Sequence, residues 1–408
     1  MLNRVWGGFF LLSGLAALMQ WYGGNDAIFG TLIAQLMAMA KLSVEILIGL
    51  AGVMALWMGL LKIAEHSGLT DRLARWLSPL LHRLMPDIPK GDPAFGAITM
   101  NLSANVLGLD NAATPMGLKA MHALQRHNPT PDTASNAQIL FLVLNTSSVT
   151  LFPIAVLLYR AQQGAANPAE VFVPILLATT ASTLAGLLCV AAVQRINLFN
   201  RVVLLWATGL MATLLALLAT VAGYTAEQLQ TFSVFWGNAA LCGFVGVILA
   251  TGYWRGVDAF GRFVEGAKEG FQTTVSIAPY LLAMLVAIGA LRGSGALDLF
   301  LEGIRSLVLL AGWDGRFVDA LPTALMKPFS GSGARAMMLE TMSSQGVDSF
   351  AGRLAALFQG STETTFYVLA VYFGGVGIRH TRHAIPCGLA ADLAGILAAI
   401  GVGYWFFG

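Results

Sequence analysis

Apolar runs of about 20 residues recur along almost the whole chain, and they constrain its fold more than any other feature. A helix of that length is long enough to span the hydrocarbon core of a bilayer. The runs lie near residues 3–21, 43–64, 137–159, 171–194, 201–222, 231–253, 271–291, 351–373 and 384–406. The sequence therefore predicts an all-α polytopic membrane protein.

The charge content agrees with this class. Only 11% of the 408 residues are charged, whereas a soluble domain carries about a quarter. The net charge of +2 is too small to indicate a basic surface for binding nucleic acid, so no nucleic-acid partner is expected. The three cysteines, Cys189, Cys242 and Cys387, lie far apart in apolar stretches and fit neither a disulfide framework nor a CxxC metal site. We interpret them as small packing residues.

The N-terminal segment, 1–42, is expected to hold one helix and an interfacial stretch. Arg4 precedes an apolar core, as in a signal peptide, but no small-residue cleavage site precedes Gly23-Gly24. We therefore retain the first run as a membrane helix. Residues 26–42 are interpreted as an amphipathic segment that leads to Lys41.

Two further apolar stretches, 94–121 and 319–342, carry glycine, proline, asparagine or serine near their middle, together with charges. A lipid-facing helix would leave such polar groups without partners. Irregular backbone at membrane depth is tolerated only inside protein or beside a wet cavity. We therefore expect both stretches to form re-entrant helical hairpins with polar tips.

The distribution of Lys and Arg predicts an orientation. Basic residues crowd 72–90 and recur around 126, 195–201, 255–268 and 379–382, whereas the loop 223–230 has none. Placing the crowded loops in the cytoplasm follows the positive-inside rule and predicts a cytoplasmic N-terminus. Three arginines do not fit this orientation, because it places them on the non-cytoplasmic side of the membrane: Arg292, Arg305 and Arg316.

Self-similarity divides the chain into two related halves. An apolar helix ends at Ser67-Gly68 in one half and at Ser294-Gly295 in the other, and an amphipathic helix follows each. Next come a polar hairpin, an apolar helix interrupted by a polar stretch (145–150 or 359–365), and a closing helix. The predicted parts are an N-terminal segment 1–42, a first repeat 43–194, connecting helices 195–254 and a second repeat 255–408.

Under the predicted orientation the first repeat starts from outside and the second from inside. Two inverted repeats, each with a re-entrant hairpin and a broken transmembrane helix, are a common design of secondary transporters. In that design the binding site lies at the membrane midplane.

Long motifs connect the chain to a known family. Residues 101–121, NLSANVLGLDNAATPMGLKAM, resemble the signature of spore maturation protein A. Residues 327–336, KPFSGSGARA, and 359–374, QGSTETTFYVLAVYFG, resemble spore maturation protein B. The resemblance covers nearly the whole chain, as a fusion of the two.

This resemblance implies a transport-type scaffold with paired hairpins. The spore maturation proteins belong with the gate, or nucleoside-recognition, domains, which are similar to parts of concentrative nucleoside transporters and ferrous-iron transport proteins. A fused form is expected in the inner (cytoplasmic) membrane of a bacterium. The resemblance implies little about the substrate.

Charged and amide side chains inside apolar segments are costly unless they are paired or functional. We expect a small-molecule substrate to contact such groups in both hairpins and both helix breaks. The candidate substrate-binding residues are Asn101, Asn105, Asp110, Asn111, Lys119, Asn145, Ser147, Lys327, Ser330, Ser332, Arg335, Gln359, Thr362 and Glu363. No residue is assigned to catalysis or to a metal.

Structural roles are an alternative for several of these residues. Asp110 could pair with Lys119 across the first hairpin, and asparagines could cap short helices. In the second hairpin one of the two cations could neutralise Glu340 or Glu363. Asp392, inside the last apolar helix, is expected to be protonated, paired or directed toward a cavity.

The second hairpin has the composition of an anion site. Glycines in the loop 330–333 permit close approach of a ligand, and a helix that begins there would present free N–H groups. Lys327 and Arg335 flank the loop. Glu363 is the carboxylate of the paired helix breaks and could hold a coupling Na⁺ or H⁺.

We expect a transporter and no enzyme, because HExxH, P-loop and GxSxG elements are absent and no base is marked beside Ser330 or Ser332. The predicted function is secondary transport of a small organic anion or phosphate-bearing amphiphile through a midplane site between the two hairpins. A nucleoside-type transporter and a non-transporting assembly or regulatory protein are the alternatives. The glycine-rich helix 384–406 could pack within one chain or against a second copy in a homo-oligomer.

Overall fold

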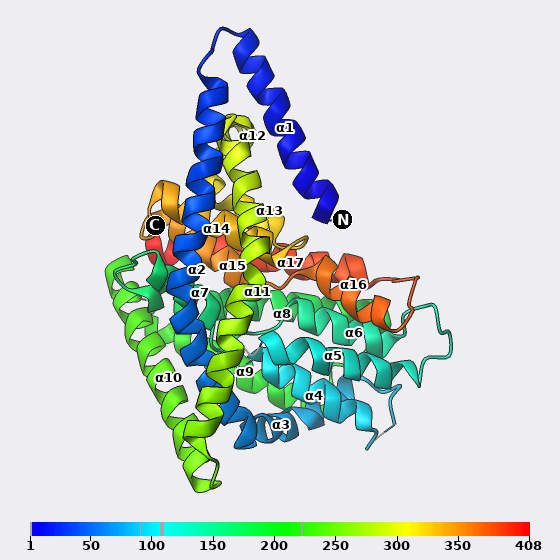
Figure 1. Cartoon of the computed structure of the whole chain (residues 1–408). Coiled ribbons are helices and arrows are strands. Elements are labelled where there is room, and N and C mark those ends of the chain that lie inside the picture. Colours follow the sequence, from blue (N-terminus) through cyan, green and yellow to red (C-terminus); the bar gives the residue numbers. More distant parts are fainter. Residues whose placement is uncertain (1, 90, 107–109, 222) are drawn as a thin grey trace. The chain divides into compact units, whose positions relative to one another are not determined.

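The computed structural model describes residues 2–89, 91–106, 110–221 and 223–408 (Figure 1). These ranges are mostly α-helical and contain no β-strand, which confirms the predicted all-α fold. The first half contains α1 (Leu2–Tyr22), α2 (Ile28–His66), α3 (Leu69–Leu84), α4 (Pro93–Val106), α5 (Asp110–Gln125), α6 (Asn136–Thr146), α7 (Ile154–Gln162), η1 (Pro168–Val171) and α8 (Phe172–Gln194). The remainder contains α9 (Arg201–Val221), α10 (Ala226–Trp254), α11 (Ala259–Gly293), α12 (Ala296–Leu310), η2 (Arg316–Ala320), α13 (Leu321–Met326), α14 (Gly331–Gln345), α15 (Phe350–Ser361), α16 (Thr365–Gly375) and α17 (Ala384–Phe407).

Several helices have the length and composition of membrane spans. Within the described ranges five qualify: Ile28–His66, Pro168–Gln194, Arg201–Val221, Ala226–Trp254 and Ala384–Phe407. A sixth span results if Leu281–Gly293 and Ala296–Leu310, bent by 69°, count as one. α9 shows most directly what surrounds the protein, since its large apolar side chains such as Leu205 are exposed. An apolar helix with so little protein contact requires lipid around it, and the chain is a multi-pass membrane protein.

The predicted boundary at residue 42 falls inside a continuous helix. α2 has 39 residues, so it is about 58 Å long, roughly twice the thickness of the hydrocarbon core. The hydroxyl of Ser43 donates back to the carbonyl of Ala40 instead of capping a new helix. Lys41 and Glu45 form an ion pair one turn apart, 3.7 Å between charged atoms, which favours helix at this point. Residues 28–42 are thus the first part of α2.

The same order of elements occurs twice in the structure. A long helix (α2 or α11) is followed by an amphipathic helix (α3 or α12), a hairpin (α4–α5 or α13–α14), an interrupted helix (α6–α7 or α15–α16) and a closing helix (α8 or α17). The turn after each long helix has the same geometry, since Gly68 and Gly295 have φ of 72° and 71°. Such left-handed angles favour glycine, which explains the repeated Ser-Gly pair.

The chain forms two compact units, and each unit draws helices from both repeats. The first unit comprises Met1–Leu60, Leu158–Pro168 and Phe263–Gln359. The second comprises Leu61–Leu157, Ala169–Arg262 and Gly360–Gly408. Each unit therefore holds one hairpin and one segment from each interrupted helix. The two repeats are intertwined, with the chain crossing between units inside helices.

Equivalent long helices pack against each other in the first unit. Gly293 and Gly289 of α11 lie against Gln35 and Met39 of α2, and Gly270 faces Ala55. A Cβ atom added at Gly270 would lie 2.7 Å from the Ala55 Cα, so only glycine permits this approach. The order of the contacts shows that α2 and α11 run antiparallel (Figure 1).

The closing helices α8 and α17 are also antiparallel, inside the second unit. The hydroxyl of Ser182 donates to the carbonyl of Ala391 at 2.9 Å, and the sulfur atoms of Cys189 and Cys387 are 3.1 Å apart. Two pairs of equivalent helices thus run in opposite directions. An inverted repeat requires this relation, and the inversion of the complete repeats stays a prediction.

Candidate functional site

The break in the first repeat separates α6 from α7 within a stretch of polar residues. α6 ends at Thr146, and the hydroxyls of Thr146 and Ser147 turn back to the carbonyl of Val143. The carbonyl of Thr146 accepts a hydrogen bond of 2.9 Å from the backbone N–H of Glu363. The hydroxyl of Thr183 on α8 donates to the carbonyl of Ser147. Side chains and the second break thus supply partners that an uninterrupted helix would provide itself.

Three of the predicted asparagines meet Tyr372 in the second unit. We call Asn101, Asn105, Asn145 and Tyr372 the amide cluster. Asn101 on α4 donates through Nδ2 to the carbonyl of Ala113 on α5 at 2.7 Å and to the Tyr372 hydroxyl at 3.2 Å. Asn105 donates to Asn145 Oδ1 at 2.8 Å, and the Tyr372 hydroxyl donates to the same oxygen at 3.4 Å. The cluster therefore links the first hairpin to both interrupted helices.

The amide cluster retains hydrogen-bonding capacity. Asn101 has no exposed surface, and its Oδ1 has no hydrogen-bond partner among the described residues. A buried acceptor without a partner costs about 1–3 kcal/mol. Tyr372 also stacks on Phe141, with ring centroids 5.8 Å apart and an interplanar angle of 8°. The arrangement can accept a hydrogen bond from a small polar ligand or a water molecule beside an aromatic ring.

The break in the second repeat packs against α17. Thr362 is buried, and its methyl group occupies the space that a side chain at Gly395 would need. Thr365 donates through Oγ1 to Asp392 Oδ2 at 2.7 Å, so the buried Asp392 has a hydrogen-bond partner in the second break. Glu363 is half-buried, and its backbone N–H donates to the carbonyl of Thr146. The break thus anchors α16 and α17 to the end of α6.

The second hairpin, in the first unit, has a different composition. α14 begins after Ser330, whose Oγ accepts a hydrogen bond of 3.0 Å from the N–H of Gly333. The hydroxyls of Ser330 and Ser332 are 3.2 Å apart. Ser330 is thus a helix cap, as its residue type favours, and it satisfies one of the N–H groups that the helix start leaves free.

Two cations and an amide surround this helix start. Lys327, which is only 5% exposed, donates from Nζ to the carbonyl of Gln359 at 2.8 Å. The side-chain Oε1 of Gln359 is buried and has no partner among the described residues. Arg335 is half-buried, and its guanidinium lies over the ring of Tyr159, 5.2 Å from the centroid. Helices α13, α14 and α15 therefore bring Lys327, Gln359 and Arg335 into one unit, as predicted for a site.

The partner of Glu340 is Arg292 on α11. Two contacts join them, from Nε to Oε1 at 2.5 Å and from Nη2 to Oε2 at 3.0 Å. Arg292 also lies 3.3 Å from Asp298. The alternative in which a hairpin cation neutralises Glu340 is therefore wrong. Arg292 of the long helix α11 neutralises Glu340 instead. Arg335 forms no ion pair with a described carboxylate.

The structure does not bring every predicted residue to these places. Lys119 is exposed on α5 and takes no part in the amide cluster. The side chains of Asp110 and Asn111 lie outside the described residues. Tyr372 and Arg292 are absent from the predicted site, although Tyr372 lies inside the apolar run 351–373 and Arg292 directly follows the run 271–291, so polarity in an apolar context could have indicated both. Among the described side chains, no three of His, Cys, Asp or Glu gather as metal ligands would.

These features define a polytopic helical membrane protein with two polar hairpins and two interrupted helices. The family model described as "Gate: Nucleoside recognition" matches residues 47–162 and 274–379, together more than half of the chain. The chain belongs to this gate family, which here includes the spore maturation proteins. One matched segment lies in each predicted repeat.

Two relatives from Bacillus subtilis (strain 168) are similar to this chain. Spore maturation protein B is 45% identical over 161 residues, which cover 40% of this chain and 89% of the relative. Spore maturation protein A is 42% identical over 149 residues, which cover 36% of this chain and 76% of the relative. No solved structure matches significantly.

Proposed function

We propose that the chain is a secondary transporter of a small organic anion, with the ligand bound at the polar hairpins and helix breaks. The gate family, the membrane helices and the interrupted helices support a transporter-like protein. The absence of a P-loop in the sequence favours secondary transport. The proposed location is the bacterial inner membrane, with the N-terminus in the cytoplasm.

Arg335 carries the proposal of an anionic substrate. It lies in the first turns of α14, it is half-buried, and no described carboxylate forms an ion pair with it. Its Nε is buried without a hydrogen-bond partner among the described residues. A guanidinium in a partly buried place binds carboxylate or phosphate strongly, because charge-assisted hydrogen bonds strengthen as water is excluded. The free Oε1 of Gln359 in the same unit would accept from a ligand hydroxyl.

Uptake into proteoliposomes tests this assignment. The purified full chain would be offered a dicarboxylate, a phosphorylated sugar and uridine as labelled probes. Arg335→Gln should reduce anion uptake to background, because the cation that compensates the substrate's charge is lost. Arg316→Gln is the matched control, since Arg316 belongs to the same unit but is exposed and paired with Asp314 at 2.7 Å. Undiminished anion uptake by folded Arg335→Gln would contradict the proposal.

A nucleoside-type transporter is the second candidate, and the amide cluster favours it. Amide groups beside a stacked aromatic pair suit an uncharged ligand with hydrogen-bonding edges, and the matching family model carries the words nucleoside recognition. In that case uridine is taken up, Asn101→Leu abolishes its uptake, and Arg335→Gln leaves it unchanged. A chain that moves none of the probes would favour the non-transporting alternative.

Coupling through Glu363 is a separate proposal. This half-buried carboxylate lies at the second break, where a proton or Na⁺ could bind with the substrate. Glu363→Gln should then remove the dependence of uptake on the pH or Na⁺ gradient. Transport by this variant with an unchanged gradient dependence would exclude Glu363 as the coupling residue.

A further inference from the structure

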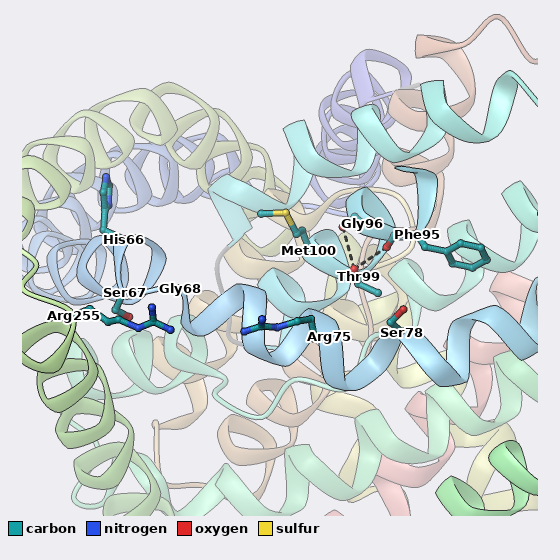
Figure 2. Close-up of a pocket in the computed structure, with 10 residues that line it drawn as sticks. All are labelled: His66, Ser67, Gly68, Arg75, Ser78, Phe95, Gly96, Thr99, Met100 and Arg255. Carbon is teal, nitrogen blue, oxygen red and sulfur yellow. Dashed lines mark hydrogen bonds between the residues drawn. The ribbon is translucent and has the colours of Figure 1, made fainter. Parts of the chain in front are cut away.

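A cavity of about 700 Å³ lies in the second unit (Figure 2). Its walls come from the end of α2, from α3 and α4, and from the residue that follows α10. None of the predicted substrate-binding residues lines it. Ligand cavities in proteins commonly measure about 300–1,000 Å³, so this space is large enough for a metabolite or a lipid headgroup.

Two arginines set the charge of the cavity. Arg75 comes from α3 and Arg255 is the C-cap of α10. Figure 2 shows their guanidinium groups pointing toward one another across the turn at Gly68. Neither forms an ion pair with a described carboxylate, and the lining contains no Asp or Glu. Two like charges that face one space repel each other unless an anion lies between them.

Hydrogen bonds hold the elements that carry the two arginines, so the walls of the cavity are fixed relative to each other. Ser67 is 2% exposed; its hydroxyl donates to the carbonyl of Ala64 and accepts from Thr251 on α10 at 3.3 Å. The carbonyl of Thr251 accepts in turn from the backbone N–H of Arg255 at 3.1 Å. The turn after α2 is therefore tied to the last turn of α10, and this tie places Arg255 beside α3.

The rest of the lining can complete the coordination of an anion. Ser78 on α3 and Thr99 on α4 carry hydroxyl groups, and His66 ends α2. The Thr99 hydroxyl already donates to the carbonyls of Phe95 and Gly96, so the guanidinium groups are the main donors. Phe95 and Met100 add apolar wall. This lining suits a molecule that joins a charged group to a less polar part.

We propose that Arg75 and Arg255 bind a phosphate group in this cavity, at a site separate from the transport site. Arginine forks match phosphate oxygens in pairs, and two of them neutralise its charge. The phosphate belongs either to a soluble phosphorylated molecule or to an anionic phospholipid. The exposed Trp76 on α3 lies against Trp206 of α9 with the rings tilted, their centroids 4.1 Å apart. Exposed tryptophans are common at the membrane surface, where both sources have access.

Binding by the purified full chain distinguishes the two sources. One arm measures thermal stabilisation by inorganic phosphate against chloride at matched ionic strength. The other measures lipid retained after extraction from nanodiscs of phosphatidylglycerol or of phosphatidylcholine. Arg75→Gln and Arg255→Gln should each weaken binding about tenfold, as expected for loss of a charge-assisted contact. Arg72→Gln is the matched control, because Arg72 is exposed on the same helix but lies outside the lining.

Each outcome has a defined meaning. Stabilisation by inorganic phosphate that both cavity variants lose indicates a soluble ligand, and selective loss of phosphatidylglycerol indicates a lipid. No response of the wild-type chain in either arm would overturn the proposal. So would an equal loss in Arg72→Gln, since that result would reflect general surface charge. Because the transport probes are absent, failure here leaves the proposed transport function to be judged by its own experiment.

Discussion

The two hairpins occupy corresponding places in the repeated order of helices, yet they carry different chemistry. The first hairpin presents neutral amides, which are held by Tyr372 and by one another. The second presents Lys327 and Arg335 at a helix start, and the same unit contains the ion pair of Arg292 and the buried Glu340. The comparison teaches that the repeated order preserves backbone breaks while the side chains diverge. Each break needs polar partners, and either amides or charges can supply them.

Removing the charge that balances Glu340 should give the largest loss of stability. In Arg292→Met the carboxylate of Glu340, 3% exposed, stays buried without its partner. The expected loss is about 3 kcal/mol, the cost of breaking a buried ion pair from one side. Titration with SDS in mixed micelles measures it. Arg316→Gln, on an exposed pair, should lose less than about 1 kcal/mol, and equal losses would show that the first unit does not depend on its buried charge.

A glycine in the first hairpin tests how tightly the amide cluster is packed. A Cβ atom at Gly117 on α5 would collide with the hydroxyl end of Tyr372, so Gly117→Ala must displace that ring. Overpacking of this kind costs about 1–3 kcal/mol. Gly96→Ala on α4 is the control, because no atom lies within 4 Å of the added Cβ. If both variants denature at the same SDS fraction, Tyr372 is not fixed as described.

Loss of one hydroxyl should have a smaller effect. Tyr372→Phe removes the acceptor for Asn101 and the donor to Asn145 and keeps the ring on Phe141. Because Asn101 keeps its bond to Ala113, we expect a loss of about 1 kcal/mol. Tyr367→Phe, at an exposed position of the same helix, should stay within about 0.5 kcal/mol of the wild type. A loss above 3 kcal/mol would mean that the amide cluster behaves as one cooperative network.

The smallest expected effect is a pH dependence at the start of α17, where His383 is the N-cap. Burial, and then the charge of Arg382, lower the pKa of His383 below its ordinary 6.5. The ring nitrogen Nε2 lies 2.9 Å from Gln194 Nε2, as a neutral imidazole that accepts from the amide. The folded state therefore resists protonation, and stability should fall as the pH drops below 6.5. Melting curves of the wild type and His383→Gln between pH 7 and 5 should diverge only toward acid.

Periodicity and polarity predicted the order of elements well. The stretches around 94–121 and 319–342 are hairpins, and the polar runs 145–150 and 359–365 interrupt helices, because these residues favour caps and turns over helix interior. The sequence predicted a boundary at residue 42, but α2 is continuous there. The ion pair of Lys41 with Glu45 and the hydrogen bond from Ser43 to the carbonyl of Ala40 favour helix at this point. Local sequence contains this information only weakly.

Contacts between distant residues could not be predicted. Cys189 and Cys387 are separated by 198 positions, yet their sulfur atoms meet, because α8 and α17 are antiparallel partners. The cavity arginines were noted only as charges that orient the chain. Their role depends on the tie between Ser67 and Thr251, which no spacing in the sequence reveals. The sequence indicates Asn101 as a substrate-binding residue and Glu340 as a possible partner of a hairpin cation, but their actual partners, Tyr372 and Arg292, follow only from the packing.

The intertwining of the repeats has a consequence for how the protein can be made. A cut in the connection 195–200 would yield two pieces, and neither would contain all the segments of either compact unit. Each piece alone would leave apolar helix faces bare, so the pieces would have to find each other during insertion. Joining them in a single polypeptide removes that search and guarantees equal supply of both.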